Sequence, residues 1–548
     1  MANDNKDKFK LNKAVIFLSW LFFVPFSIGI FLILTASLCT TIYYDLYQEA
    51  DLPRFGKENV PLLIVLSVVV FLLLYRYWKR IRKQSGSVSN NDFSKSSTYK
   101  KNSTIKLSLI WAGAVCLYLI LIVRGLATND ALQLDVIIND FMRGDFSSLT
   151  QPGGYLFVYP FQLGYVAIGQ LIYILFGESN YLVYQLINVL SILVTIWLLY
   201  KITWELFEKE TICRLMAVLS TGMFFLFMYA DFVYSDIWSI APEVAAIYFT
   251  IRYLKNKKKS DVILAGILNG FAIVLKTNAY IAMIAMVIMI VLDAFRTSVK
   301  PEDGKKDGTA KNDLFRRVMT AIIISAMMLI VAKGMQFAVN TGYAKAAGID
   351  EISKGVPSTT YLAMAMHESG GEPGWYDGYN VDTYGECGYD RDLTSETAVK
   401  DILNSLSTFK ERPLHACRFY LRKFLSQWAD SSCISMRNLE LTSRHVDGQP
   451  KILESLVYGS ARTIVSWIMN VFHFICYLGV FVYCISIYKS RKFSFEEAFL
   501  ILFLLGGMLF HELWEGSSRY IIRYYVCMLP LAAAGFDRLF TQINRKAK

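Results

Sequence analysis

Several patterns that would define other classes of protein are missing from this sequence of 548 residues. Its nine cysteines form no Cys-x-x-Cys pair and show no cysteine–histidine spacing typical of zinc ligands, which argues against a zinc site. Its apolar stretches lack the alternation of a transmembrane β-barrel and the repeated, broken helices of many transporters. The first apolar run, from Ala14, is longer than a signal-peptide core and has no small-residue cleavage site, so we expect no cleavable signal.

Long hydrophobic runs are what the sequence has in excess. Hydrophobic residues make up 54% of the chain, above the roughly 45–50% of soluble domains. A helix needs about 20 apolar residues to cross a hydrocarbon core ~30 Å thick, so the sequence predicts an all-α polytopic membrane protein with about twelve transmembrane helices. We expect these spans at residues 14–40, 59–77, 107–124, 181–203, 213–230, 236–254, 262–276, 278–295, 317–338, 457–487, 496–513 and 521–537.

Basic residues gather in short segments between the expected spans, and this fixes the predicted orientation. Examples are residues 76–83, 255–260, 300–317 and 489–492. Such clusters normally stay in the cytoplasm, so we expect both chain termini and the Ser/Asn/Lys-rich segment 82–106 there, the latter as a disordered linker. The same bias explains the net charge of +11, and no nucleic-acid partner is predicted.

The predicted topology divides the chain into five parts. They are a two-helix membrane segment (1–81), the linker (82–106), a transmembrane core (107–338), a small mixed extracytoplasmic domain (339–456) and a C-terminal transmembrane segment (457–548). The core contains a large outer loop, 125–180. Within it, residues 155–177 are apolar enough to span, but a span there would invert the later basic loops. We therefore expect interfacial helices at this position.

A run of carboxylates follows the third expected span, in the stretch "LATNDALQLDVIINDFMRGD". Asp130, Asp135 and Asp140 are predicted near the outer membrane surface, where an enzyme acting on a lipid-linked substrate needs a base. An ionised aspartate there can take the proton of an acceptor hydroxyl as the new bond forms. The alternative is that these acids only solvate an interfacial loop.

Four features together resemble the GT-C membrane glycosyltransferases. They are an Asp in the first large outer loop, an interfacial helix entered at Tyr159-Pro160, the stretch "LFGESNYLVYQLINVL" and the terminal stretch "WEGSSRYIIRYYVCMLPLAAAG". More narrowly, residues 107–537 are similar to bacterial relatives of protein O-mannosyltransferases and of the lipid A aminoarabinose transferase. The resemblance implies a GT-C-like fold of the inverting type. It also implies transfer of a hexose or pentose from a polyprenyl-phosphate donor to a polysaccharide, teichoic acid, glycolipid or protein outside the membrane. The matching position for the catalytic base is Asp130, with Asp135 and Asp140 as alternatives.

Three further acids stand near the next outer turn, in "MYADFVYSDIWSIAPEVAAIY". Many GT-C relatives have an acid here that faces the first-loop Asp, in some of them with a divalent cation. The resemblance therefore implies Asp236 and Asp231 as ligands of Mg²⁺ or Mn²⁺ together with a substrate phosphate. A polar turn without metal is the alternative. Glu243 is predicted to be buried, and a buried acid in a membrane is usually functional or paired.

Positive charge near the outer surface runs against the topological bias and therefore needs a reason. Lys276 lies in a predicted outer hairpin, and Arg519 and Arg523 lie at the outer end of the last span. A lipid phosphate supplies the reason, because a guanidinium can bind it through two hydrogen bonds and stabilise the charge of the leaving group. Snorkelling to the headgroups is the alternative for Lys276. The residues expected to bind substrate are Arg519, Lys276, Arg523, Tyr159, Glu243 and Glu515.

Two other functions would use the same features. A transporter or flippase of lipid-linked saccharide explains the spans and the basic residues. A polymerase or ligase of wall polysaccharide would place its key residues in the large outer domain, near His415 and Arg418. That domain also has three cysteines, Cys387, Cys417 and Cys433, of which two could form one disulfide.

Overall fold

The structure is a computed structural model, and it describes residues 9–10, 13–48, 50–86, 103–298, 307–368 and 371–547. Most of the expected linker, 82–106, lies outside these residues. Its two ends are helical, because α2 (Val60–Gly86) extends beyond the basic cluster at 76–83 and α3 starts at Ser103.

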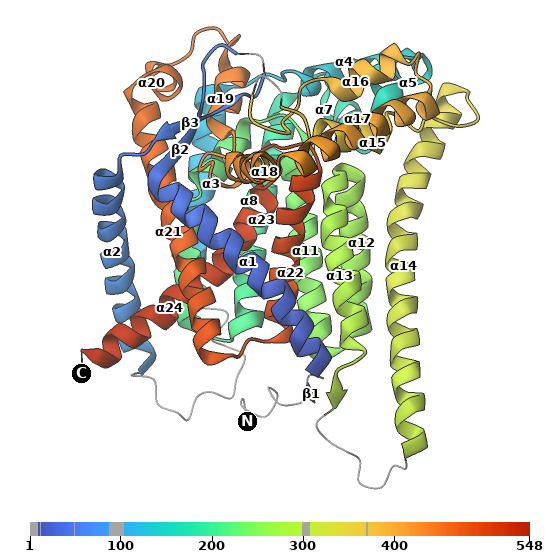
Figure 1. Cartoon of the computed structure of the whole chain (residues 1–548). Helices are drawn as coiled ribbons and strands as arrows, with labels where there is room; N and C mark the ends of the chain where they lie inside the picture. Colours follow the sequence, from blue (N-terminus) through green and yellow to red (C-terminus); the bar gives the residue numbers. More distant parts are fainter. Residues whose placement is uncertain are drawn as a thin grey trace.

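Long helices run between two ends of the molecule and form a bundle (Figure 1). The bundle helices other than α2 are α1 (Lys13–Cys39), α3 (Ser103–Val123), α8 (Tyr181–Phe207), α9 (Glu210–Ser220), α11 (Ser235–Asn256), α12 (Lys259–Leu275), α13 (Tyr280–Asp293), α14 (Asp307–Ala347), α21 (Ser460–Ser490), α22 (Phe495–Leu513) and α24 (Leu529–Lys546). A short pair of strands, β1 (Phe9–Lys10) and β4 (Thr297–Ser298), lies at the lower end of the view.

A further set of elements covers the upper end of the bundle (Figure 1). They are the hairpin β2 (Thr40–Tyr44) and β3 (Pro53–Lys57), and the helices α4 (Asp130–Met142), α5 (Ser147–Thr150), α6 (Tyr155–Val158), α7 (Leu163–Phe176), α15 (Ser358–Met364), α16 (Tyr379–Glu386), α17 (Arg391–Glu411), α18 (Pro413–Trp428), α19 (Ser435–Ser443) and α20 (Lys451–Tyr458). Short helical turns complete the chain: η2 (Pro160–Gln162), α10 (Phe224–Phe227), η3 (Met228–Asp231), η4 (Thr277–Ala279) and α23 (Ile522–Cys527).

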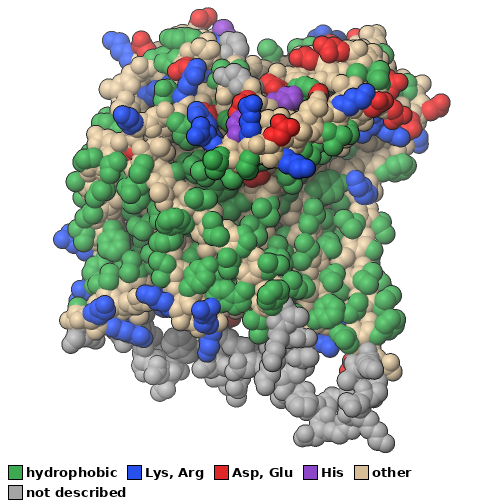
Figure 2. Space-filling model, in the orientation of Figure 1, with side chains coloured by type: hydrophobic (Ala, Val, Ile, Leu, Met, Phe, Trp, Pro, Cys, Tyr) green, Lys and Arg blue, Asp and Glu red, His purple; other side chains and the backbone are tan. Residues whose placement is uncertain are grey.

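A belt of hydrophobic side chains crosses the middle of the bundle on the face shown in Figure 2, and charged side chains gather above and below it. Phe17, Leu121 and Ile330 are between 67% and 73% exposed, although they lie within long apolar helices. Water would not favour such a surface, whereas lipid tails do. The protein is therefore a multi-pass membrane protein.

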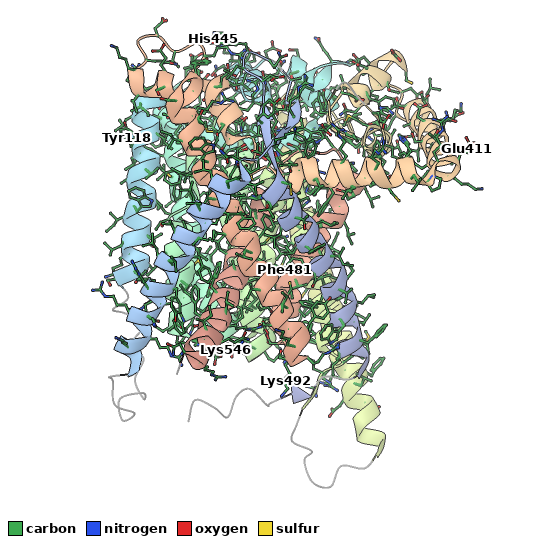
Figure 3. All side chains as sticks on the ribbon, turned by 60° about the vertical axis from the view of Figure 1, so that its left-hand side comes forward. Tyr118, Glu411, His445, Phe481, Lys492 and Lys546 are labelled. Atoms are coloured by element: carbon green, nitrogen blue, oxygen red, sulfur yellow. The ribbon has the colours of Figure 1, made fainter. Side chains whose placement is uncertain are left out.

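Two of the basic segments, 489–492 and the C-terminal one, lie at the same end of the bundle. Figure 3 places Lys492 and Lys546 at the end opposite to Glu411 and His445. This arrangement agrees with the predicted grouping of the basic segments on one side of the membrane. That this side is the cytoplasm stays a prediction.

The expected number of twelve spans is not confirmed. Among the described residues, six helices are long and apolar enough to cross a membrane, or eight if two bent helix pairs each count as one span. Several expected spans are too short or too polar for this criterion. α13 has 14 residues and α12 has 17, while α11 contains charged residues that face protein partners inside the bundle.

The segment 155–177 is not one straight helix. The chain bends by 90° between the stretch ending at Val158 and the stretch starting at Pro160, and α7 then packs against α4. The hydroxyl of Tyr343, near the upper end of α14, donates a hydrogen bond to Gln170 on α7. These contacts hold α7 at the upper end of the bundle (Figure 1).

The region 339–456, expected to be mixed in structure, is helical in its regular elements. A helix, α16, lies within the glycine-rich stretch 371–388. An isolated bridge between Trp375 and Gly516 joins this region to the loop after α22. All nine cysteines, which lie within the described residues, are free, and Cys387, Cys417 and Cys433 form no disulfide.

Candidate active site

A cavity of about 680 Å³ lies at the upper end of the bundle. Segments from distant parts of the sequence line it: the β2–β3 loop, the start of α4, the turn after η3, the α12–η4 junction and the loop 514–520. Of the residues expected to form a site, the cavity brings together Asp130, Tyr159, Lys276, Glu515 and Arg519.

Two cations line this cavity, and both pair with a buried carboxylate. We call Lys276, Arg519 and Asp236 together the basic wall. The ammonium nitrogen of Lys276 lies 3.1 Å from Oδ1 of Asp236, and Nε of Arg519 lies 3.7 Å from Oδ2. The second distance is too long for a hydrogen bond. Neither Asp236 Oδ2 nor Arg519 Nε has a hydrogen-bond partner among the described residues, and both atoms are buried.

Aromatic rings hold the two cations of the basic wall in place. Lys276 Nζ lies 4.6 Å from the ring centre of Tyr234, and the Arg519 guanidinium lies 5.6 Å from the rings of Tyr234 and Tyr520. A cation over a ring face is stabilised by the negative quadrupole of the ring. The rings thus orient the positive charge without neutralising it.

Acidic side chains also line the cavity, and we call Asp51 and Asp130 together the acidic wall. Asp130 is the first residue of α4, where the helix dipole stabilises a carboxylate, and its side chain is exposed to the cavity. Asp51 lies on the loop between β2 and β3. Burial raises the pKa of Asp51, and the nearby charge of Asp130 raises it further, while Arg519 and Arg437 act in the opposite direction.

Glu515 lies on the loop between α22 and α23 and also lines the cavity. Its Oε1 accepts a hydrogen bond of 3.0 Å from the hydroxyl of Tyr520. Burial raises the pKa of Glu515 to about 7, although Tyr520, Arg519 and Lys276 lower it. The charge of this side chain therefore changes near neutral pH.

Aromatic side chains complete the cavity and offer both apolar faces and hydroxyl groups. Tyr361 and Trp514 stack with ring centres 4.8 Å apart and planes inclined by 11°. Tyr155, Tyr159 and Tyr376 also line the cavity. Such rings provide a large contact area with polar edges, as a sugar requires.

Two of the acids predicted as alternative bases lie elsewhere. Asp135 is buried on α4, and its Oδ2 accepts hydrogen bonds of 2.7 Å from Ser179 and from Tyr181. Asp140 is on the last turns of α4, and neither residue lines the cavity. The helical geometry of α4 explains this difference. Asp135 and Asp140 are five and ten residues after Asp130, and at these spacings the side chains lie on other faces of the helix than Asp130.

The predicted metal ligands are also separated. Both carboxylate oxygens of Asp231 are occupied: Oδ1 accepts hydrogen bonds from Gly125 N and Gln185, each of 3.0 Å, and Oδ2 accepts one from Thr442. Asp236 has cationic neighbours instead. No group of three or more His, Cys, Asp or Glu side chains within the described ranges is arranged to hold a metal ion. These residues do not fit a divalent metal site as they stand, and dependence on Mg²⁺ or Mn²⁺ stays a prediction.

Glu243 and Arg523 form a second, closed ion pair below the cavity. They are 0% and 3% exposed, and Arg523 also donates a hydrogen bond of 3.0 Å to Ser239. Neither side chain lines the cavity. The structure therefore pairs these two predicted substrate-binding residues with each other.

Two buried side chains that the sequence analysis missed hold the loops around the cavity. Asp430 Oδ2 accepts hydrogen bonds from Tyr44 on β2 and from Ser518, which precedes Arg519. Lys423 donates to three backbone carbonyls, including those of Glu512 and Trp514. A polar side chain in the sequence does not by itself indicate such a role. Only the fold shows that Asp430 and Lys423 are fully buried.

The residues named for a polymerase or ligase lie on α18, away from the cavity. His415 is 3.7 Å from Glu368, and Arg418 is exposed. Neither lines the cavity.

Comparison with known proteins agrees with the predicted family. Residues 163–302 match the family model described as dolichyl-phosphate-mannose-protein mannosyltransferase. This stretch includes Asp236 and Lys276, and it excludes Asp130 and Arg519. The predicted resemblance to the GT-C membrane glycosyltransferases is thereby confirmed.

Among solved structures, the chain is similar to the archaeal oligosaccharyltransferase AglB from Archaeoglobus fulgidus, in complex with an inhibitory peptide and a dolichol-phosphate. The identity is 16% and the TM-score 0.40, and the alignment covers 81% of this chain. The chain spans about half, 51%, of that structure's length. No curated protein matches the chain significantly.

Proposed function

We propose that the protein is a glycosyltransferase that moves a sugar from a polyprenyl-phosphate donor to an acceptor at the outer face of the membrane. One observation carries this proposal: the two cations of the basic wall and Asp130 line a single cavity at the upper end of the bundle. The family description, which names a dolichyl-phosphate-linked sugar, supports the same class of donor.

The basic wall has the charge that a single phosphodiester needs. Lys276 and Arg519 contribute two positive charges and Asp236 one negative charge, which leaves one positive charge in excess. A polyprenyl-phosphate sugar carries one negative charge, and its lipid tail can lie along the exposed apolar helices. A nucleotide sugar has no such tail, and it is found in the cytoplasm rather than outside.

The chemistry follows from the two walls. Asp130 takes the proton of the acceptor hydroxyl while the acceptor oxygen forms a bond with the anomeric carbon of the donor sugar. The bond from that carbon to the phosphate oxygen breaks, and its electron pair stays with the phosphate. The phosphate then carries one more negative charge, which Arg519 and Lys276 stabilise. A single displacement of this kind inverts the anomeric centre.

The acceptor is a hydroxyl of a surface polysaccharide, teichoic acid, glycolipid or protein. The test uses the purified chain with radiolabelled polyprenyl-phosphate hexoses, compared with the matching nucleotide sugars. We expect transfer from the lipid-linked donor. Asp130→Asn should lower kcat by about 10²–10⁴, the usual effect of removing a general base.

Asp140→Asn is the matched control, because it removes the same group from the same helix outside the cavity. It should leave kcat within about twofold of the wild type. Use of the nucleotide sugar alone would refute the donor assignment. Full activity of Asp130→Asn would refute the assignment of the base.

A further inference from the structure

We propose that Asp51, on the hairpin between α1 and α2, binds the acceptor and selects neutral or amine-bearing sugars over anionic ones. This inference rests on the proposed function, because it assigns the acceptor side of the same cavity. Asp51 belongs to a part of the chain that lies outside the family match at 163–302 and outside the predicted resemblance at 107–537.

The position of Asp51 is the first argument. It lines the cavity and lies within electrostatic reach of both Asp130 and Arg519, so it stands where the acidic and basic walls meet. The acceptor hydroxyl must reach this point, since it touches the base on one side and the donor sugar on the other. A carboxylate beside the base can therefore accept hydrogen bonds from neighbouring groups of the acceptor.

The second argument is that the Asp51 carboxylate accepts no hydrogen bond within the described part of the chain. Arg519 and Arg437 act on its charge, but neither forms a close ion pair with it there, and its charge is partly removed from water. An acid in such a place is costly unless a ligand supplies donors. Sugar hydroxyls or an ammonium group would supply them, whereas a phosphate or carboxylate of an acceptor would be repelled by both Asp51 and Asp130.

The third argument is the way the hairpin is held. The buried Arg437 and the neighbouring Arg444 both donate to the backbone carbonyl of Gln48, three residues before Asp51. Glu440 pairs with both arginines and keeps their side chains in place. These contacts fix the loop, and the Asp51 side chain lines the cavity.

The base of the hairpin is tied to the basic wall. Tyr44 on β2 donates to Asp430, and the same oxygen of Asp430 accepts from Ser518. Arg519 follows Ser518 directly in the chain. One buried carboxylate therefore sets the position of the hairpin relative to the donor phosphate site.

The experiment compares Asp51→Asn with the wild type, using three acceptor probes of the same shape. They are the p-nitrophenyl glycosides of glucose (neutral), glucosamine (cationic) and glucuronic acid (anionic). Binding is followed by quenching of tryptophan fluorescence, since Trp375 and Trp514 line the cavity. Transfer is followed with the lipid-linked donor.

For Asp51→Asn we expect the Kd and the KM of the neutral and cationic probes to rise about tenfold, the effect of one lost charge-assisted hydrogen bond. The preference over the glucuronide should shrink by a similar factor. The donor KM should stay within about twofold. Asp51→Glu keeps the charge and should restore part of the preference, and thermal unfolding of each variant shows whether it is folded.

Asp45→Asn is the matched control, because Asp45 lies on the same hairpin, is 41% exposed and pairs with Arg54. It should change none of these values by more than about twofold. An unchanged order of the three probes in Asp51→Asn would overturn the inference. The absence of transfer from any lipid-linked sugar by the wild type, with the binding preference intact, would instead overturn the proposed function and leave Asp51 as a saccharide-binding residue.

Discussion

Two ion-pair clusters lie close together near the end of the bundle, and they differ in how they balance charge. In the upper cluster, Asp236 has two cationic partners, Lys276 and Arg519, and both of these line the cavity. In the lower cluster, Glu243 has one cationic partner, Arg523, and both are almost completely buried. Arg519 and Arg523 are only four residues apart in the sequence.

The difference teaches how to tell a structural ion pair from a binding site. A closed pair with equal charges has no reason to bind an anion, and removing one partner leaves an uncompensated charge in the interior. An open cluster with one excess positive charge is stable only while water or a ligand supplies the missing negative charge. The lower cluster therefore supports the fold, and the upper cluster is the one suited to a phosphate.

The largest expected effect breaks the lower cluster. Glu243→Ala leaves Arg523 buried without its carboxylate and should destabilise the protein by about 3–5 kcal/mol. The measurement is the Tm of the purified protein in detergent. The double variant Glu243→Leu with Arg523→Leu should recover a large part of the loss, because no buried charge remains unpaired. Loss of activity in Glu243→Ala at an unchanged Tm would mean instead that Glu243 contacts substrate.

The next effect concerns the upper cluster. Arg519→Ala should weaken the use of the lipid-linked donor by about 10- to 150-fold, equal to about 1.5–3 kcal/mol for one charge-assisted contact. Arg519→Lys should lose less, because it keeps the charge but not the two-pronged geometry. The measurement is kcat/KM for the donor at saturating acceptor. Equal losses in both variants would show that geometry alone matters at this position.

The members of the upper cluster could be predicted from the sequence because each conflicts with its expected surroundings. Lys276 and Arg519 are positive charges on the side where few are expected, and Asp130 and Asp236 are acids at the ends of apolar spans. Such conflicts are visible without a structure. The sequence nevertheless predicted more acids in the site than the structure places there. The carboxylate of Asp135, for example, accepts hydrogen bonds from Ser179 and Tyr181 inside the protein.

Other parts of the site could not be predicted, because they depend on contacts between distant segments. Asp51 lies in a loop between the first two spans, and nothing in the local sequence connects it with Asp130 or Arg519. Asp430 joins Tyr44 to Ser518 across nearly the whole chain. The order of helices along the chain was predictable because apolar periodicity is a local property of the sequence. The contacts between loops were not predictable because they join segments that are far apart in the sequence.

The smallest expected effect is a pH dependence of donor binding. It tests whether the excess positive charge of the basic wall governs that binding. The pKa of Glu515 is raised to about 7 by burial, so its carboxyl group is mostly neutral at pH 6 and mostly ionised at pH 8. The Glu515 carboxyl group has four charged or titratable neighbours, and none of these four is a histidine. They are Tyr520, Arg519, Lys276 and Asp130. Ionisation adds one negative charge beside the basic wall and cancels its excess positive charge.

The affinity for an anionic donor should therefore fall as the pH rises through about 7. A penalty of about 1 kcal/mol, typical of charges in a partly hydrated cavity, corresponds to a donor KM about fivefold higher at pH 8 than at pH 6. The donor phosphodiester does not titrate in this range, so the change reports the protein. Glu515→Gln keeps an oxygen that can accept from Tyr520 but has no charge to gain, and its donor KM should stay constant between pH 6 and 8. If the variant keeps the wild-type dependence, a different group changes its charge, and the excess positive charge of the basic wall does not govern donor binding.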